Sequence, residues 1–236
     1  MTPPSRPARH WVIGDVHGCA DALERLLRRL PASDRLVFCG DVINRGPEIE
    51  RAMLMVWSLV RGGRAVWLRG NHEQELLECL DRGHWFGSRG LAGCDTYRQL
   101  GDGTCRLWRD RLAELPLVHH GEGWVATHAG FDPQTWAPDL NVRMPFWQAY
   151  DGRFGEVVVG HTPGPELRRL NGIVMVDTGA SYGGELTAYC PETRRSVAVP
   201  GLGHGQPAAH GAANRSLLPL GLGGLALRPM LGECSA

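Results

Sequence analysis

Short apolar runs alternate with helix-like stretches along the first third of the chain. In the helix-like stretches, apolar residues recur at the spacing of one helix face, which predicts amphipathic helices. Strict alternation of strand and helix predicts a parallel sheet with right-handed crossovers. The predicted strands are 10–13, 35–39 and 64–68, and the predicted helices are 19–30, about 48–60, and a third that begins just after residue 71.

A second group of apolar runs follows residue 115. Between the two groups, 79–115 has a mostly helical pattern interrupted by glycines, and we expect it to form a cap over a site. The last three runs look like an antiparallel set, so the fold class that we predict is α/β: a mixed β-sandwich flanked by helices. The later predicted strands are 117–119, 124–127, 156–160, 173–176, 184–190 and 195–199.

The 236 residues fit one domain of ordinary size with short appendages. We place that domain at 10–200, after an amino-terminal extension at 1–9. Residues 201–236 are rich in Gly, Ala, Pro and Leu without a sustained period, which predicts a poorly ordered carboxyl-terminal tail.

Charge and cysteine content narrow the class of protein. The 25 basic and 25 acidic residues cancel, so no net field favours a nucleic acid or an anionic membrane as partner. The amino terminus lacks the apolar core of a signal peptide, and no run approaches membrane-spanning length. Seven cysteines, an odd number without a C-x-x-C pair, indicate reduced thiols in a cytoplasmic protein.

Polar side chains capable of holding metal follow several of the predicted strands. Because the carboxyl ends of parallel strands meet at one sheet edge, we expect these side chains to converge. Any one of them is more often a helix cap, and Asp15 in particular could cap the next helix; six independent caps would be a poor explanation. Mixed carboxylate, imidazole and amide donors suit Mn²⁺, Fe or Zn²⁺. The candidates are Asp15, His17, Asp41, Asn71, His128 and His161.

Three motifs in the first part of the chain resemble those of the phosphoprotein phosphatase family of metallophosphoesterases. They are Gly-Asp-Val-His-Gly at 14–18, Gly-Asp-Val-Ile-Asn-Arg-Gly at 40–46 and Gly-Asn-His-Glu at 70–73. Two later motifs, at 128–130 and 160–163, are similar to the remaining ligand motifs of that family. Within it, the chain looks most like bacteriophage lambda protein phosphatase and the bacterial Ser/Thr protein phosphatases. The resemblance covers about residues 10–199.

That resemblance implies two divalent metal ions, most often Mn²⁺, with Fe and Zn²⁺ as the other pairing. Asp41 would bridge them, since one shared oxygen ligand holds such ions about 3.5–4 Å apart. By the resemblance, the first ion would be held by Asp15, His17 and Asp41, and the second by Asp41, Asn71, His128 and His161.

The same motifs imply roles for three more residues. Arg45 would bind phosphate oxygens through its forked donors, where an arginine outside any motif would more often be a solvated loop cation. His72 would be the general acid for the leaving group, an effect worth about 10²–10⁴ in rate. The family usually pairs this histidine with an aspartate, and Asn44 stands there instead. We expect its amide to accept the imidazole N–H without stabilising the imidazolium, which would make His72 a weaker acid.

A second phosphate-binding arginine stays open between Arg143 and Arg153, because the family's usual position after Trp147 is not an arginine. The function that we predict is hydrolysis of phosphoserine and phosphothreonine in a phosphoprotein or phosphopeptide, by direct attack of a dimetal-bound hydroxide. The alternative is a symmetrical diadenosine tetraphosphate hydrolase acting on a dinucleoside polyphosphate. Glu73 slightly favours the first activity and Asn44 weakly favours the second. A less favoured alternative is a metal-binding scaffold without catalysis.

Overall fold

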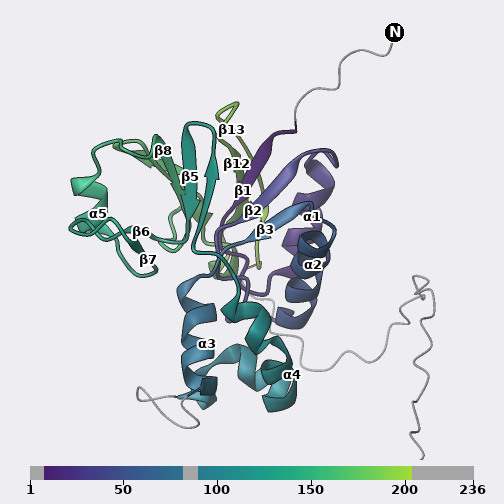
Figure 1. Cartoon of the computed structure of the whole chain (residues 1–236). Coiled ribbons are helices and arrows are strands. Elements are labelled where there is room, and N and C mark those ends of the chain that lie inside the picture. The colour runs from purple at the N-terminus through teal and green to yellow at the C-terminus, as the bar shows by residue number, and fades with distance from the viewer. Residues whose placement is uncertain (1–7, 82–89, 204–236) are drawn as a thin grey trace, which may run out of the picture.

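The computed structural model describes residues 8–81 and 90–203 (Figure 1). Most of the predicted amino-terminal extension, and the predicted tail beyond residue 203, lie outside the described residues. Within the described part, none of the helices combines the length and apolar character that crossing a membrane requires.

The amino-terminal strands form the predicted parallel arrangement, with β2 hydrogen-bonded between β1 and β3. On its other side β1 pairs antiparallel with β12, and β11 and β13 both pair with β12 to complete a six-stranded sheet. Buried positions Ala22, Leu23 and Leu26 fix one face of α1 toward the core. The bounds are β1 (His10–Ile13), α1 (Ala20–Arg29), β2 (Arg35–Phe38), α2 (Ile49–Arg61), β3 (Ala65–Trp67), β11 (Asp177–Thr178), β12 (Glu185–Cys190) and β13 (Arg195–Pro200).

The second sheet has the order β4-β5-β8-β10-β9, and β5, β8 and β10 run parallel to one another. The prediction that 173–176 belongs to an antiparallel set with the last two strands is therefore wrong. A continuous apolar run indicates burial on both faces but carries no information about which strand lies beside it. The bounds are β4 (Val118–Gly121), β5 (Trp124–Thr127), β8 (Glu156–Val159), β9 (Arg168–Leu170) and β10 (Ile173–Met175).

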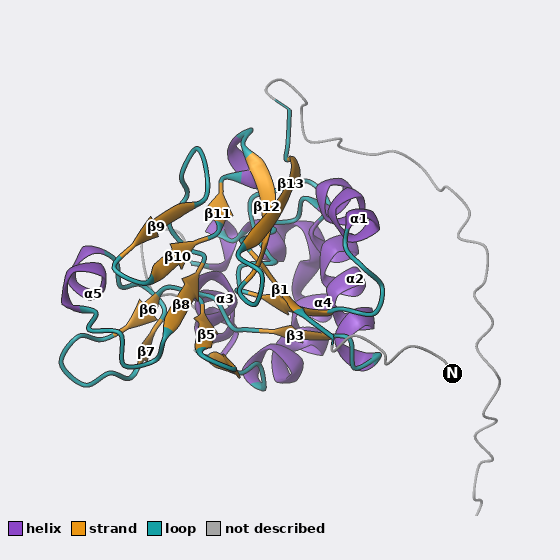
Figure 2. Ribbon diagram, turned by 90° about the horizontal axis from the view of Figure 1, so that it is seen from above, coloured by secondary structure: helices purple, strands orange, loops and turns teal. Residues whose placement is uncertain are grey.

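Side-chain alternation divides the core into three parts. Val12, Val158 and Val174 are among the residues that meet between the two sheets, and their chain neighbours face outward. On the first sheet those neighbours pack under α1 and α2, and on the second sheet they pack under α5 (Met144–Ala149). Figure 2 shows the resulting order: helices, first sheet, second sheet, then α5. The α/β sandwich flanked by helices is thus confirmed.

The described part of the region 79–115, which we predicted to cover the site, instead packs against the first layer of the core. It contains the last residues of α3 (Asn71–Asp81), a short 3-10 turn η1 (Leu91–Gly93) and α4 (Asp95–Ala113). Trp108 of α4 packs against Trp67 and Trp57, so this helix extends the core of the first layer. None of the described residues in 90–115 lines the pocket at the strand ends. A small ribbon of β6 (Gly130–Phe131) and β7 (Pro138–Asp139), which the sequence did not predict, precedes α5.

Candidate metal centre

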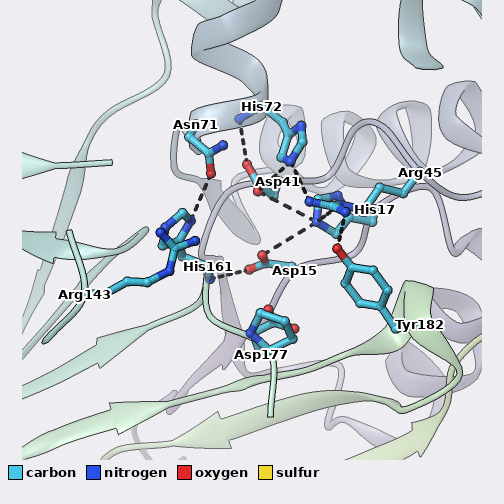
Figure 3. Close-up of a pocket in the computed structure, with 11 residues that line it drawn as sticks. Asp15, His17, Asp41, Arg45, Asn71, His72, Arg143, His161, Asp177 and Tyr182 are labelled. Atoms are coloured by element: carbon cyan, nitrogen blue, oxygen red, sulfur yellow. Dashed lines mark hydrogen bonds and ion pairs between the residues drawn. The ribbon is translucent and has the colours of Figure 1, made fainter. Parts of the chain in front are cut away.

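Strand ends from both sheets converge on one small pocket, with a volume of about 60 Å³ (Figure 3). The first sheet contributes the residues that follow β1, β2 and β3, and the second sheet contributes those that follow β5 and β8. All six predicted ligands are buried there, with His128 behind the pocket wall at 0% exposure. The pocket is lined by Asp15, His17, Asp41, Arg45, Asn71, His72, Arg143, His161, Pro163, Asp177 and Tyr182.

Asp41 belongs to two clusters of potential metal ligands. In the first, its carboxylate lies 3.8 Å from His17 Nε2 and 3.8 Å from His72 Nε2. In the second, it lies 3.6 Å from His128 Nε2, with His161 in the same group. Asp15 Oδ2 is 3.8 Å from His17 Nε2, so Asp15 can join the first cluster, where His72 is an additional neighbour. The shared position of Asp41 is what a bridging ligand requires.

Backbone carbonyls set the tautomers of two histidines. His17 Nδ1 donates to the Ile43 carbonyl at 2.8 Å, and His128 Nδ1 donates to the Cys39 carbonyl at 2.7 Å. A neutral imidazole has one N–H, so each Nε2 keeps a lone pair directed into the site. This orientation of metal-binding histidines by a carbonyl is the usual supporting interaction in metalloproteins.

The donor atoms around Asn71 are arranged as a cation site requires. Its amide nitrogen lies 3.4 Å from Glu75, which directs Oδ1 toward His128 and His161. Oδ1 is 2.9 Å from His128 Nε2, so two lone-pair atoms face each other. His161 Nε2 is buried without a hydrogen-bond partner. Because a shared cation would satisfy all of these atoms, the residues present fit a metal site.

Burial disfavours the charged forms of the ligand side chains. It raises the pKa of Asp15 and Asp41 well above the usual range of a carboxyl, and neighbouring carboxylates add to the effect on both. Burial lowers the pKa of His17 to about 3 and that of His161 to about 4. Acids that resist ionisation and imidazoles that stay neutral are expected where a divalent ion would normally supply positive charge.

Glu73 holds the loop that presents Asp41. It is fully buried, and its carboxylate accepts backbone N–H groups of Asp41 at 2.8 Å, Val42 at 2.9 Å and Gly70 at 2.9 Å. Glu73 therefore orients this loop as well as the start of α3. Gly40 and Gly70 approach so closely that a Cβ on Gly40 would lie 2.6 Å from the Gly70 backbone.

The alternative role of Asp15 as a helix cap is excluded. The residue before α1 is Cys19, and α1 has no side-chain cap. Asp15 instead accepts the His161 backbone N–H at 3.0 Å, which ties the end of β1 to the end of β8. His17, Asp41 and His161 all have positive φ, an uncommon conformation that concentrates at functional sites.

The expected hydrogen bond between Asn44 and His72 has the opposite direction. The Asn44 oxygen accepts the Thr96 backbone N–H at 2.9 Å and the Thr96 hydroxyl at 2.7 Å. Its NH₂ group therefore faces His72 Nδ1 at 2.8 Å and donates to it. The prediction that this amide accepts the imidazole N–H is wrong, because Thr96, 52 residues away, already occupies the oxygen.

Arg45 lies at the mouth of the pocket. Its Nε donates to His17 Nε2 at 3.1 Å, one terminal nitrogen lies 3.1 Å from His72 Nε2, and the other donates to the Tyr182 hydroxyl. Burial, followed by this nearby guanidinium, lowers the pKa of His72 to about 4.

The choice between Arg143 and Arg153 is resolved by position. Arg143 lines the pocket, beside His161 (Figure 3). Arg153 pairs with Asp151 at 2.7 Å and lies 3.8 Å over the Trp136 ring, outside the pocket lining. Two guanidinium groups therefore lie at the pocket.

Tyr182 and Asp177 were not among the predicted site residues, yet both line the pocket. Asp177 follows β10 as the ligands follow their strands, and that position was the available signal. The signal for Tyr182 was weaker: an aromatic residue just before two glycines.

Comparison with known proteins gives a consistent picture. The family model of calcineurin-like phosphoesterases matches residues 8–188. A symmetrical bis(5'-nucleosyl)-tetraphosphatase of Dechloromonas aromatica is 37% identical over 128 residues, which cover 52% of this chain and 44% of that protein. This chain thus matches less than half of that relative's length. An asymmetrical bis(5'-nucleosyl)-tetraphosphatase, PrpE of Oceanobacillus iheyensis, is 28% identical over 80% of this chain and 90% of its own length.

A solved structure of a proposed diadenosine tetraphosphatase superposes with a TM-score of 0.63 at 24% identity, covering 84% of this chain and 96% of that one. At that identity the likeness concerns the fold. The activities named for the two relatives correspond to the alternative substrate considered from the sequence.

Proposed function

Because the chain belongs to the calcineurin-like phosphoesterase family, we propose that it is a metal-dependent hydrolase of dinucleoside polyphosphates. The observation that carries the reaction class is the sharing of Asp41 by two ligand clusters. The named relatives favour this substrate over a phosphoprotein. We propose Mn²⁺ as the metal, which suits the mixed oxygen and nitrogen donors. We propose the cytoplasm as the compartment, since none of the described cysteines is joined in a disulfide.

The ligands proposed for the two ions are those predicted from the sequence: Asp15, His17 and Asp41 for one, and Asp41, Asn71, His128 and His161 for the other. Bound divalent ions supply charge that acidifies water and neutralises phosphoryl oxygens. Beside them, Arg45 and Arg143 would bind the remaining phosphate oxygens, since a guanidinium offers paired donors in a fixed plane.

The contact between Asn44 and His72 supports a substrate with a good leaving group. Asn44 presents a donor to His72 Nδ1, so that nitrogen has no acceptor that would stabilise a second N–H. An alkoxide from serine needs a proton as it departs, whereas a nucleotide phosphate ionises near pH 6 and can leave as an anion. A phosphoanhydride therefore demands less from His72 than a phosphoserine ester does.

The test is one comparison on one preparation. With Mn²⁺ present, we expect kcat/KM for diadenosine tetraphosphate to exceed that for a phosphoserine peptide by about 10²-fold, the size of one missing general-acid contribution. Chromatography of the products would show two ADP for symmetrical cleavage, or ATP with AMP for asymmetrical cleavage.

Asp41→Asn is the control for metal-dependent turnover, with Asp110→Asn as a matched change at an exposed aspartate. A faster reaction with the phosphopeptide would replace the proposed substrate by the one first predicted from the sequence. If Asp41→Asn kept full activity, that result would contradict the proposed site. If the native protein turned over neither substrate, that result would favour the scaffold alternative.

A further inference from the structure

A second cavity adjoins the metal pocket. Its volume is about 410 Å³, within the range of small-molecule sites. Pro163 and Tyr182 line both cavities, so the two lie side by side. The second cavity is lined by Pro163, Gly164, Pro165, Thr178, Gly179, Tyr182 and Gly184.

The Tyr182 ring is held in place at the junction of the two cavities. It ends the 3-10 turn η2 (Ala180–Tyr182), which lies between Gly179 at φ 76° and Gly183 at φ 86°. The Gly179 carbonyl accepts the Tyr182 N–H at 2.9 Å and the Gly184 N–H at 3.0 Å, which closes the turn. At 53% exposure the ring is nonetheless open to a ligand.

Tyr182 also contacts the phosphate-binding side of the site. Its hydroxyl accepts a hydrogen bond from Arg45, and the guanidinium carbon of Arg45 lies 5.0 Å from the ring centroid. A Cβ on Gly179 would touch the Cβ atoms of Pro163 and Tyr182 at 3.9 Å each, so these two side chains flank an open glycine. The space between them is flat, apolar and directly beside the pocket for phosphate.

Few hydrogen-bond donors in this cavity remain free to bond to the edge of a ligand's ring. The N–H groups of Gly164, Gly179 and Gly184 bond at 3.0–3.1 Å within the protein, to Asp177 and to the Gly179 carbonyl. The Thr178 hydroxyl donates to the Glu185 carbonyl at 2.6 Å. What the cavity offers is mainly ring surface, which recognises an aromatic ligand by stacking with little regard to its identity.

We propose that the second cavity is the nucleoside subsite, in which Tyr182 stacks on one base while the phosphates of the same substrate occupy the metal pocket. This inference rests on the proposed function, because it requires a substrate with a base joined to a phosphate chain. In this arrangement Tyr182 determines the preference of the enzyme for nucleotides over other phosphate compounds. Because stacking does not distinguish bases strongly, the enzyme should accept different bases.

The test separates the ring from its hydroxyl. Tyr182→Ala should raise KM for diadenosine tetraphosphate about 5- to 100-fold, the range measured for loss of one base–aromatic stack. Tyr182→Phe, which keeps the ring and loses only the bond to Arg45, should recover most of the KM increase seen in Tyr182→Ala. Inorganic tripolyphosphate has no base, so its KM should be no higher in Tyr182→Ala than in Tyr182→Phe, which has lost the same bond to Arg45. Leu107→Ala removes a side chain that is 75% exposed on α4 and serves as the control.

An equal rise in KM for tripolyphosphate and diadenosine tetraphosphate would overturn the subsite, because Tyr182 would then act only by positioning Arg45. Discrimination of more than about 100-fold between diadenosine and diguanosine tetraphosphate would contradict recognition by stacking alone.

A binding measurement without metal or turnover keeps this inference distinct from the proposed function. Saturation-transfer NMR with adenosine should show contact between the base and the protein for native and Tyr182→Phe, and none for Tyr182→Ala. That result would support the subsite even if the protein did not hydrolyse diadenosine tetraphosphate. A failure to hydrolyse it would refute only the proposed function. Absence of adenosine contact in the native protein would refute the subsite.

Discussion

The direction of a single amide governs the chemistry available to His72. Two donors from Thr96 hold the Asn44 oxygen, so its nitrogen donates to His72 Nδ1. An aspartate in the same position would keep the bonds to Thr96 and present its second oxygen to an imidazole N–H. The two side chains differ only in that an amide nitrogen replaces a carboxylate oxygen. That one group decides whether an imidazolium at His72 faces a hydrogen-bond donor or an anion.

Asn44→Asp should therefore raise the pKa of His72 from its value of about 4, because the new carboxylate stabilises the imidazolium. The basic limb of the pH–rate profile, where the acid form is lost, should move upward by about 1–3 pH units. Hydrolysis of a phosphoserine peptide should gain relative to diadenosine tetraphosphate, since only the peptide needs the proton. A profile that matches the native one would sink the idea, and Gln134→Glu, the same change from amide to carboxylate at an exposed position, is the control.

At the scale of elements, the start of α4 supports the loop that carries Arg45. Asp95 accepts the Arg45 backbone N–H at 3.0 Å, the Thr96 hydroxyl accepts the Asn44 N–H at 3.0 Å, and Gln99 donates to the Gly46 carbonyl at 2.8 Å. Asn44 and Arg45 both have positive φ, so the loop is in a conformation that other contacts must stabilise. A helix predicted to cover the site thus acts from behind it.

Thr96→Val tests that support. The substitution keeps the shape of a fully buried side chain and removes its hydroxyl, which leaves two polar groups of Asn44 short of a partner. We expect the free energy of unfolding to fall by about 1–3 kcal/mol in urea titration. We also expect kcat to decrease, because the Asn44 amide keeps only the bond from the Thr96 backbone N–H and is held less firmly toward His72. Thr96→Ser retains the hydroxyl and should remain near native in both measurements.

Across the whole molecule, the site joins the two sheets. Asp41 follows β2 of the first sheet, while His128 and His161 follow β5 and β8 of the second. A metal bound to all three would connect the layers at their carboxyl edges, in addition to the apolar core between them. Ligand binding to the folded state alone adds to its stability by mass action.

Mn²⁺ at about 100 times its Kd should raise the free energy of unfolding by about 2.7 kcal/mol, and a chelator should reverse the gain. At one fixed Mn²⁺ concentration, the gain should be larger at pH 7.5 than at pH 5.5. Because the pKa values of Asp15 and Asp41 are raised in the fold, protonation of these carboxyls stabilises the metal-free protein, and this contribution is lost as pH rises. At the lower pH, a metal ion must therefore displace those protons to bind. His17 and His161, with pKa values of about 3 and 4, are already neutral at both pH values.

Thermal unfolding of chelated and Mn²⁺-loaded protein at the two pH values measures this effect. Asp41→Asn should show no shift with Mn²⁺, and Asp110→Asn should behave as the native protein. A metal-induced shift that is larger at pH 5.5 would contradict the assignment of carboxylates as the protonated ligands.

The sequence by itself determined which donors meet and why. Apolar runs in alternation with helices imply parallel strands, parallel strands end at one edge, and polar residues placed after them must converge. This reasoning, together with the motifs, located all six candidate ligands as well as Arg45 and His72.

Only the tertiary structure decided how neighbours from distant segments orient these groups. The direction of the Asn44 amide depends on a threonine 52 residues away, and the place of Tyr182 is seen through its contact with Arg45, 137 residues away. The pairing of β10 and the position of Arg143 beside His161 depend in the same way on how the two sheets pack. Local pattern fixes residue type and periodicity, whereas hydrogen-bond direction and cavity shape arise from contacts that no local window contains.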